Sequence, residues 1–118
     1  MNLKDKILAL AVANTVVAVA SDNVPEGIFV KKLSIGEREI YAKKIDKAMK
    51  KSKDNAMNAL AFCLVACDEH GEPIFSEDDI DDVNKLPSDL VLDVLDTFNQ
   101  INGFSQKSQK AVDTAEKN

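Results

Sequence analysis

The chain has 118 residues, of which 45% are hydrophobic and 30% are charged, as in an ordinary globular protein of about one domain. Aromatic residues make up only 5% and there is no Trp, so the core must be aliphatic and rich in alanine, which favours helices. A formal net charge of -5 and a pI of about 4.8 argue against a nucleic-acid groove or an anionic membrane surface.

The charge is divided unevenly between the two halves of the chain. Residues 1–53 contain 11 Lys/Arg and 6 Asp/Glu (+5), whereas residues 54–118 contain 4 and 14 (-10). This asymmetry predicts opposite-charge contacts, either between the halves or head-to-tail between subunits. The alternative is that these charges form the solvated faces of a soluble domain.

The apolar run Ile7–Ala20 near the N-terminus has two interpretations. Ala18-Val19-Ala20 in front of Ser21 resembles a signal-peptidase site. Asp5 in the basic segment before the run, and the polar pair Asn14-Thr15 inside it, argue against a signal peptide. The run is also too short and too interrupted to span a membrane.

We therefore divide this run into a helix and a strand. Lys4–Ala11 predicts a short amphipathic helix, because its apolar residues recur on or near one side. These residues are Leu3, Ile7, Leu8 and Leu10. The β-branched segment Thr15–Val19 predicts a strand, the turn residues of Asp22–Gly27 follow, and Ile28–Leu33 is again extended. We expect a β-hairpin over Thr15–Leu33, which must pack on helices or pair with a neighbouring subunit because a lone hairpin is marginally stable.

A capping box predicts the start of the next helix. Ser34 is the expected N-cap and Glu37 the residue that reaches back to it, with the helix running to about Lys50. Apolar residues at three- and four-residue steps are expected to face the core: Ile40, Tyr41, Ile45, Ala48 and Met49. The lysines between them are expected to face solvent: Lys43, Lys44, Lys47 and Lys50.

The segment Ser52–Asn55 breaks this pattern and caps a second helix. That helix is predicted from Ala56 to about Cys67, and it is apolar nearly all round, which is typical of a central buried element. The polar turn Asp68–Pro73 ends it, with Gly71 able to take a left-handed conformation. Ser76 is then expected to cap a short acidic helix from Glu77 to about Val83, with Ile80 and Val83 pointing inward.

The last predicted helix starts at Leu86-Pro87-Ser88 and stops at Gly103. Its apolar face consists of Leu90, Val91, Val94, Leu95, Phe98 and Ile101, with Phe104 as an anchor that folds back. The sequence thus predicts an α+β fold that is mainly α, with an N-terminal β-hairpin packed with about four helices. We expect one globular domain over residues 1–104 and a mobile polar tail over 105–118.

The spacing of Cys63, Cys67 and His70 invites a metal-site interpretation. The two cysteines are expected to share a helix face, and the histidine follows in the turn. A structural zinc site needs four ligands, and the chain contains no other cysteine or histidine. We therefore expect core cysteines and a turn histidine, with both thiols reduced because neighbouring turns of one helix do not offer disulfide geometry.

The segment Asp68–Asp79 has the twelve-residue length of a calcium loop but not its ligand pattern. His70 replaces an acidic ligand, Pro73 takes the glycine position, and Asp79 replaces the bidentate glutamate. Carboxylates such as Asp78 and Asp81 are expected on an exposed helix face, and no phosphate loop or nucleophile elbow is present. We assign no catalytic, cofactor-binding or metal residue and expect no cofactor and no enzyme activity.

Three groups of residues resemble phage tail assembly chaperones of long non-contractile-tailed, lambda-like phages. The first group is Val24-Pro25-Glu26-Gly27 with Phe29-Val30-Lys31-Lys32-Leu33-Ser34 and Glu37-Arg38. The second is Cys63-Leu64-Val65, Asp68-Glu69-x-Gly71-x-Pro73-Ile74-Phe75 and Ser76-Glu77-Asp78-Asp79-Ile80. The third is Phe98-Asn99-x-Ile101-Asn102-Gly103-Phe104. Their order and spacing carry the resemblance, which covers about Val24–Phe104.

The resemblance implies a role in assembly without chemistry. Such chaperones bind and solubilise the tape measure protein, help recruit tail tube protein, and are absent from the finished virion, so we expect this chain to act in the host bacterial cytoplasm. The uneven charge would also suit head-to-tail self-association along a long client. The net charge of -5 predicts no nucleic-acid or membrane partner. A small helical adaptor of an unrelated pathway is the alternative.

The end of the chain agrees with a further property of this family, which makes a short product and a longer, -1 frameshifted one. Glu116-Lys117-Asn118 can be encoded as GAA AAA AAC, which contains the slippery heptamer A AAA AAC. The resemblance implies that this chain is the short product and that the longer form reaches the tail tube protein.

Overall fold

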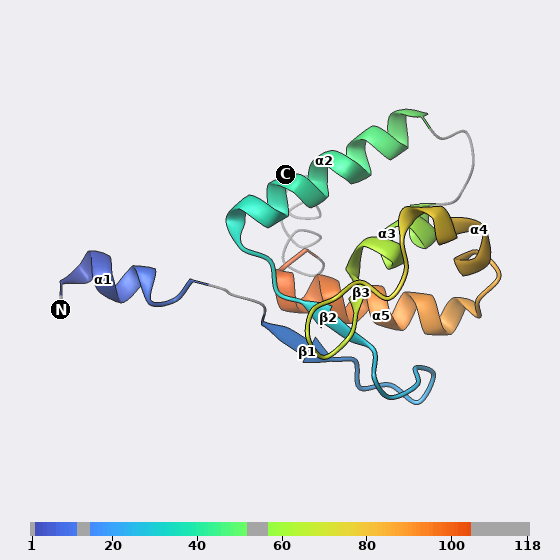
Figure 1. Ribbon diagram of the computed structural model, residues 1–118, viewed down its shortest axis with the longest axis horizontal. Coiled ribbons are helices and arrows are strands. Elements are labelled where there is room, and N and C mark those ends of the chain that lie inside the picture. Colours follow the sequence, from blue (N-terminus) through green and yellow to red (C-terminus); the bar gives the residue numbers. More distant parts are fainter. Residues whose placement is uncertain (1, 12–14, 52–56, 105–118) are drawn as a thin grey trace, which may run out of the picture.

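A computed structural model describes residues 2–11, 15–51 and 57–104, and it confirms an α+β fold that is mainly helical (Figure 1). The described elements are α1 (Leu3–Leu8), β1 (Val16–Ala18), β2 (Phe29–Lys31), α2 (Ile35–Lys51), α3 (Met57–Val65), β3 (Ala66–Cys67), the 3-10 turn η1 (Glu77–Asp79), α4 (Ile80–Val83) and α5 (Ser88–Asn102). The expected tail over 105–118 and the break over Ser52–Asn55 lie outside the described residues, and the extent of the domain stays a prediction.

The predicted hairpin is present, and it gains a third strand. β1 pairs antiparallel with β2, with Val17 opposite Val30, and β2 pairs antiparallel with β3, with Val30 opposite Ala66. The predicted central helix was therefore too long: it ends at Val65, and Ala66–Cys67 are strand. Pairing with the second edge of β2 satisfies backbone groups that would be left unpaired beside a helix.

A tight turn returns the chain after β3. The Asp68 carboxylate accepts the backbone N–H groups of His70 (2.8 Å) and Glu72 (3.0 Å), and Gly71 has a φ of 82°. The Ile74 N–H then donates to the Ala66 carbonyl at 3.3 Å. The left-handed residue expected at Gly71 is confirmed, and the turn holds β3 in an extended conformation.

The capping box of α2 is confirmed. The Ser34 N–H donates to Glu37 Oε1 (3.1 Å) and the Glu37 N–H donates to Ser34 Oγ (3.2 Å). Tyr41 and Ile45 pack on the core, but Ile40 is 59% exposed, so its expected inward position was wrong. α2 contacts the core only along a narrow line, and Ile40 lies beside it. Ala48 is half-buried, the side chain of Met49 lies outside the described part, and Lys43, Lys44, Lys47 and Lys50 are exposed as predicted.

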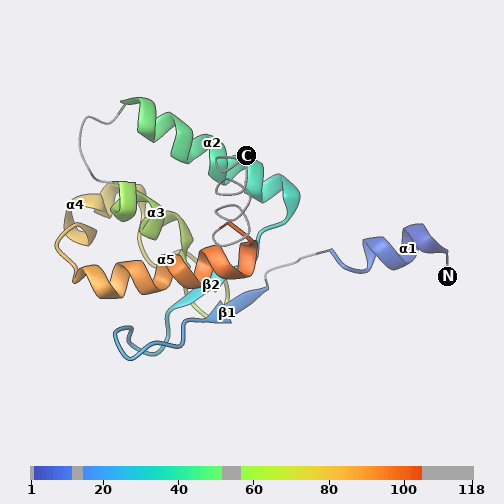
Figure 2. The same ribbon diagram turned by 180° about the vertical axis from the view of Figure 1, so that it is seen from behind.

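The core lies between α3, α5 and the sheet, with α4 closing the far side (Figures 1 and 2). Its largest fully buried side chains are Val30, Phe62, Val83, Val94 and Phe98, each at most 1% exposed. The expected apolar face of α5 is therefore confirmed, and the core is mostly aliphatic, as the composition predicts.

The predicted acidic helix is divided in two. Ser76 and Asp79 form a reciprocal capping box around the 3-10 turn η1, and α4 follows with Val83 buried. α5 begins at Ser88, within the expected start, but Pro87 is its N-cap and not a residue of its first turn; Gly103, with a φ of 71°, is its C-cap. The Phe104 N–H donates to the Asn99 carbonyl at 2.8 Å, which directs this ring back onto the helix.

The predicted N-terminal helix is present as α1, but it buries no residue and stands apart from the other elements (Figure 1). Asn2 caps it, since its Oδ1 accepts the Asp5 N–H at 2.8 Å. No helix among the described residues is long and apolar enough to cross a membrane.

Candidate functional site

The two cysteines lie on different elements. Cys63 is on α3, whereas Cys67 is in β3 and its Sγ donates to the Phe29 carbonyl at 3.4 Å. They do not share a helix face, because the helix ends between them. Both are free and buried, and burial raises the pKa of both thiols.

The remaining residues of the predicted metal and calcium sites lie in the turn after β3 or accept hydrogen bonds from nearby backbone N–H groups. His70 is exposed in the turn, with Nε2 3.3 Å from Glu69 Oε1. The hydrogen bonds from the backbone of Glu72 and His70 lower the pKa of Asp68, and Asp79 Oδ2 accepts the Ser76 N–H at 2.8 Å. Across the described residues, no three His, Cys, Asp or Glu groups lie close enough to hold a metal ion.

Among the hollows of the described residues, two that combine several elements are candidate binding surfaces. The first, the sheet-side groove, has a volume of about 300 Å³ and lies between α2, β2, α3, α5 and the turn after β3. Its lining is Lys31, Leu33, Glu37, Ile40, Tyr41, Lys44, Leu64, Val65, Gly71, Pro73 and Phe98. Tyr41, Leu64 and Phe98 provide apolar surface, and the exposed Ile40 belongs to this lining.

An aromatic cluster fixes one wall of the sheet-side groove. The ring centroids of Tyr41 and Phe98 are 5.1 Å apart, those of Phe98 and Phe104 are 5.8 Å apart, and the Arg38 guanidinium carbon lies 4.1 Å from the Phe104 centroid. Burial raises the pKa of Tyr41. These contacts hold the first turns of α2 against the end of α5.

An ion pair lies at the edge of the sheet-side groove. Lys31 Nζ is 2.6 Å from Glu37 Oε2. The pKa of Glu37 is lowered, mainly by the Lys31 hydrogen bond and next by the Ser34 backbone. Glu37 also accepts the Ser34 N–H in the capping box. Its carboxylate therefore links Lys31 of β2 to the N-terminus of α2.

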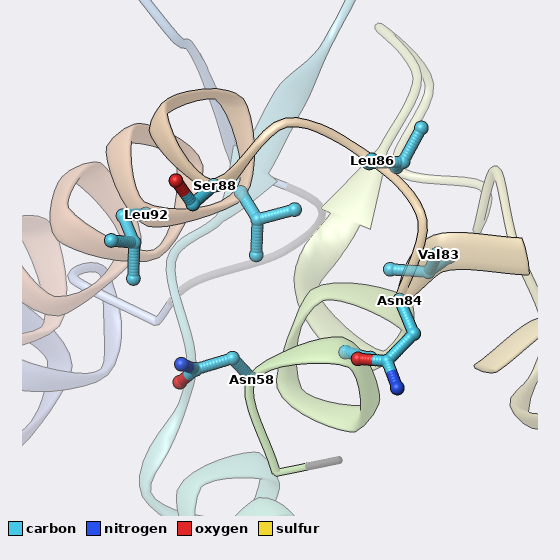
Figure 3. A pocket seen from close by; sticks show the side chains of 8 residues that line it. Asn58, Val83, Asn84, Leu86, Ser88 and Leu92 are labelled. Atoms are coloured by element: carbon cyan, nitrogen blue, oxygen red, sulfur yellow. The ribbon is translucent and has the colours of Figure 1, made fainter. Parts of the chain in front are cut away.

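The second hollow, the helix-side pocket, has a volume of about 170 Å³. Its lining is Asn58, Ala59, Val83, Asn84, Leu86, Ser88, Val91 and Leu92. Figure 3 shows these side chains on α3, on the end of α4 and the connection that follows it, and on the start of α5. Leu92 is 45% exposed. Leu92 is apolar but does not follow the three- and four-residue spacing of the core face of α5. This apolar residue outside the core face is the feature of the sequence that could have indicated an exposed apolar site.

The comparison with protein families identifies the chain. Residues 5–102 match the family model described as "Phage tail assembly chaperone, TAC". The chain belongs to the phage tail assembly chaperone family. No curated protein and no solved structure was found to match it.

The family match confirms the resemblance and extends it. The three groups of residues begin at Val24, whereas the match begins at residue 5 and so includes most of α1. Both hollows of this chaperone lie within the matched residues. A chaperone acts by binding other proteins, which accords with apolar hollows that have polar edges.

Proposed function

We propose that this chaperone binds the tape measure protein, keeps it soluble, and helps recruit tail tube protein during tail assembly in a phage with a long non-contractile tail. The family membership supports the general role. We further propose that the protein acts in the cytoplasm of the host bacterium and does not remain in the virion.

The observation that carries the proposal is the sheet-side groove. A groove that receives an amphipathic helix needs apolar anchoring positions and a polar edge. Here Ile40 and Leu64 offer aliphatic surface, and Lys31, Glu37 and Lys44 supply the edge. The aromatic cluster holds the wall rigid, so little conformational entropy is lost when a client helix binds.

Recruitment of the tail tube protein is proposed for a longer, frameshifted form. Glu116-Lys117-Asn118 lie outside the described residues, so the support for this step is the sequence alone. The nucleotide sequence of the gene tests it directly. A codon choice at these three positions that lacks the A AAA AAC heptamer removes this support for the frameshift.

Co-expression with the tape measure protein tests client binding. We expect the wild-type chaperone to raise the soluble fraction of the client and to co-purify with it. Ile40→Asp should abolish both effects, because client binding would then remove a charged carboxylate from water without giving it a hydrogen-bonding or ionic partner. The monomer should still fold, since this side chain is 59% exposed.

Ile35→Asp is the matched control, because Ile35 is on the same helix, is 83% exposed, and does not line the groove. It should leave client solubility unchanged. A wild-type chaperone without effect on the client contradicts the proposed function. Equal loss in both variants contradicts the assignment of the sheet-side groove.

A further inference from the structure

The sheet-side groove follows one side of α2. The helix lines it with Glu37, Ile40, Tyr41 and Lys44, which recur at three- and four-residue steps. This spacing extends over two helical turns, roughly 10 Å. The floor beside α2 is apolar and consists of Leu33, Tyr41, Leu64, Val65 and Phe98. A client helix that lies along α2 therefore places its apolar side on this floor and one flank on each wall of the groove.

The wall that α2 forms is basic. Lys44 and Lys47 are exposed and, on an α-helix, lie on the same flank as Ile40. The acids in this part of the helix, Glu39 and Asp46, fall on the other flank. Neither lysine forms an ion pair with another described residue. Both are therefore available to carboxylates of a bound helix.

The turn after β3 forms a second wall, which is acidic. Gly71 and Pro73 line the groove, and the exposed Glu72 lies between them. Glu69 is exposed in the same turn, beside His70. Two exposed carboxylates and one imidazole give this wall the opposite charge to α2. In Figures 1 and 2, α2 lies at the top and the sheet that carries this turn lies below it.

The other charged groups near the groove do not alter this division. Three of them already have partners: Lys31 lies 2.6 Å from Glu37, Arg38 donates to the Asn102 carbonyl at 3.1 Å, and Asp68 accepts backbone N–H groups of its own turn. Lys32 alternates to the face of the strand opposite Lys31, and Asp96 lies on the side of α5 opposite Phe98. α3 contains no charged residue.

We propose that the sheet-side groove selects a client helix with oppositely charged flanks, carboxylates toward α2 and Lys or Arg toward the turn after β3. The inference rests on the proposed function, since it describes the helix that this chaperone binds there. Complementary charges across an interface fix its register, and like charges oppose binding. Turning such a helix end for end exchanges its flanks, so the groove binds it in one direction.

Three synthetic peptides test the charge preference. Each is an alanine-based helix of about 18 residues, long enough to be partly helical alone, with leucines at three- and four-residue steps. One has Glu on one flank and Lys on the other, one has Glu on both flanks, and one has Lys on both. Fluorescence anisotropy at low salt should show that the wild-type chain binds the first at least about threefold more tightly than the others. Ile40→Asp should bind none of them.

Reversing the charge of the α2 wall should change which peptide binds best. Lys44→Glu with Lys47→Glu makes both walls acidic, so the peptide with Lys on both flanks should now bind most tightly. Lys43→Glu with Lys50→Glu is the matched control, because these exposed lysines lie on the side of α2 opposite Tyr41. This control makes the same change of net charge and should keep the wild-type order.

Reversing the charge of the turn should have the opposite effect. Glu69→Lys with Glu72→Lys makes both walls basic, so the peptide with Glu on both flanks should bind most tightly. Glu26→Lys with Glu39→Lys is the matched control, since both residues are exposed and neither lines the groove. It should keep the wild-type order.

A nitroxide at the N-terminus of the peptide with unlike flanks measures the direction of binding. It should broaden amide resonances at one end of the groove, near either Glu37 or Lys44. Combining the two wall reversals should move the broadening to the other end, because the charges of the walls are then exchanged.

Equal affinity for the three peptides, no binding of any of them, or an order that the wall variants leave unchanged overturns the inference. So does a direction that the combined variant does not reverse. Circular dichroism verifies that each variant is folded. The proposed function fails in a different experiment, in which the wild type has no effect on client solubility. A chaperone that solubilises the tape measure protein without distinguishing the peptides retains that function and contradicts only the charge preference.

Discussion

At the scale of single residues, Asn102 connects the sheet to the last helix. Its Oδ1 accepts the Leu33 N–H (2.8 Å), and its Nδ2 donates to the Lys31 (3.2 Å) and Phe98 (3.0 Å) carbonyls. The Arg38 guanidinium donates to the Asn102 carbonyl at 3.1 Å. Asparagine provides both a donor and an acceptor on a short side chain, so this one residue joins β2 and α5.

Asn102→Ala should lower the free energy of unfolding by about 1–3 kcal/mol, because it leaves the Leu33 N–H and the Lys31 carbonyl without these partners. Chemical denaturation measures the change. Gln100→Ala, at an exposed position on the same helix, is the control and should stay within about 0.5 kcal/mol of the wild type. Equal effects in the two variants would show that the asparagine bridge is not important for stability.

The lowered pKa of Glu37 predicts how the free energy of unfolding changes with pH. Its pKa lies below the ordinary value of 4.5 because Lys31 and the Ser34 backbone favour the charged carboxylate. The folded state therefore binds this proton less readily than the unfolded state. The contribution of Glu37 is fully present above about pH 4.5 and is lost as the pH falls through the lowered folded value.

Denaturation midpoints measured between about pH 6 and pH 3 should fall less steeply for Glu37→Gln than for the wild type. Glu39→Gln is the control, since Glu39 is exposed on the same helix. An unchanged slope in Glu37→Gln would mean that the Lys31 pair does not contribute in solution.

At the scale of elements, the aromatic contacts decide where α2 lies. Only a narrow line of α2 reaches the core, and Tyr41 in that line contacts Phe98 of α5 and, at 5.9 Å between centroids, Phe104. Because so few side chains of α2 contact the core, the position of this helix depends strongly on each of them. The wall of the sheet-side groove depends on the same contacts.

Phe98→Ala should destabilise the protein by about 3–5 kcal/mol, since this ring is 1% exposed and its removal leaves a cavity between α2 and α5. Thermal or chemical unfolding measures the loss. Asp96→Ala, at an exposed position of the same helix, should change stability by less than about 0.5 kcal/mol. A loss below about 1 kcal/mol for Phe98→Ala would indicate that α2 is held by other contacts.

At the scale of the whole molecule, the distribution of charge predicts how copies meet. The chain carries +5 over residues 1–53 and -10 over 54–118. In the described residues, α1 and α2 carry exposed lysines, whereas α4 and α5 carry exposed aspartates. Attraction between such surfaces is long-range and is screened by salt.

If copies meet through these opposite charges, as the charge asymmetry predicts, their self-association should weaken as salt is added, with the dissociation constant rising between low and physiological ionic strength. Lys4→Glu with Lys6→Glu should remove or reverse this dependence. Lys43→Glu with Lys47→Glu makes the same change of net charge on α2 and should weaken it as well, because these lysines belong to the same basic half. Sedimentation at several salt concentrations provides the measurement. A wild-type dissociation constant that does not change with salt would contradict the electrostatic part of the interface.

Local patterns in the sequence determined most of the elements. The Ser34–Glu37 capping box, the β-branched strand before the Asp22–Gly27 turn, the apolar periodicity of α5 and its stop at Gly103 all act within a few residues. Each predicted its element because helix caps, turns and periodic burial are short-range effects. The motifs that carried the family resemblance are also local, and the match over residues 5–102 confirms the family to which they pointed.

Three features follow only from the tertiary structure: the formation of strand β3, the exposure of Ile40, and the positions of the sheet-side groove and the helix-side pocket. Ala66–Cys67 continue an apolar helical pattern, and they become strand only because the edge of β2 lies beside them. Ile40 has the spacing of a core residue, and its exposure follows from how few contacts α2 makes. The sheet-side groove and the helix-side pocket each combine residues from three or more elements, so no stretch of sequence contains them. The reason is physical: local sequence fixes backbone preference, whereas burial and concavity depend on what packs alongside.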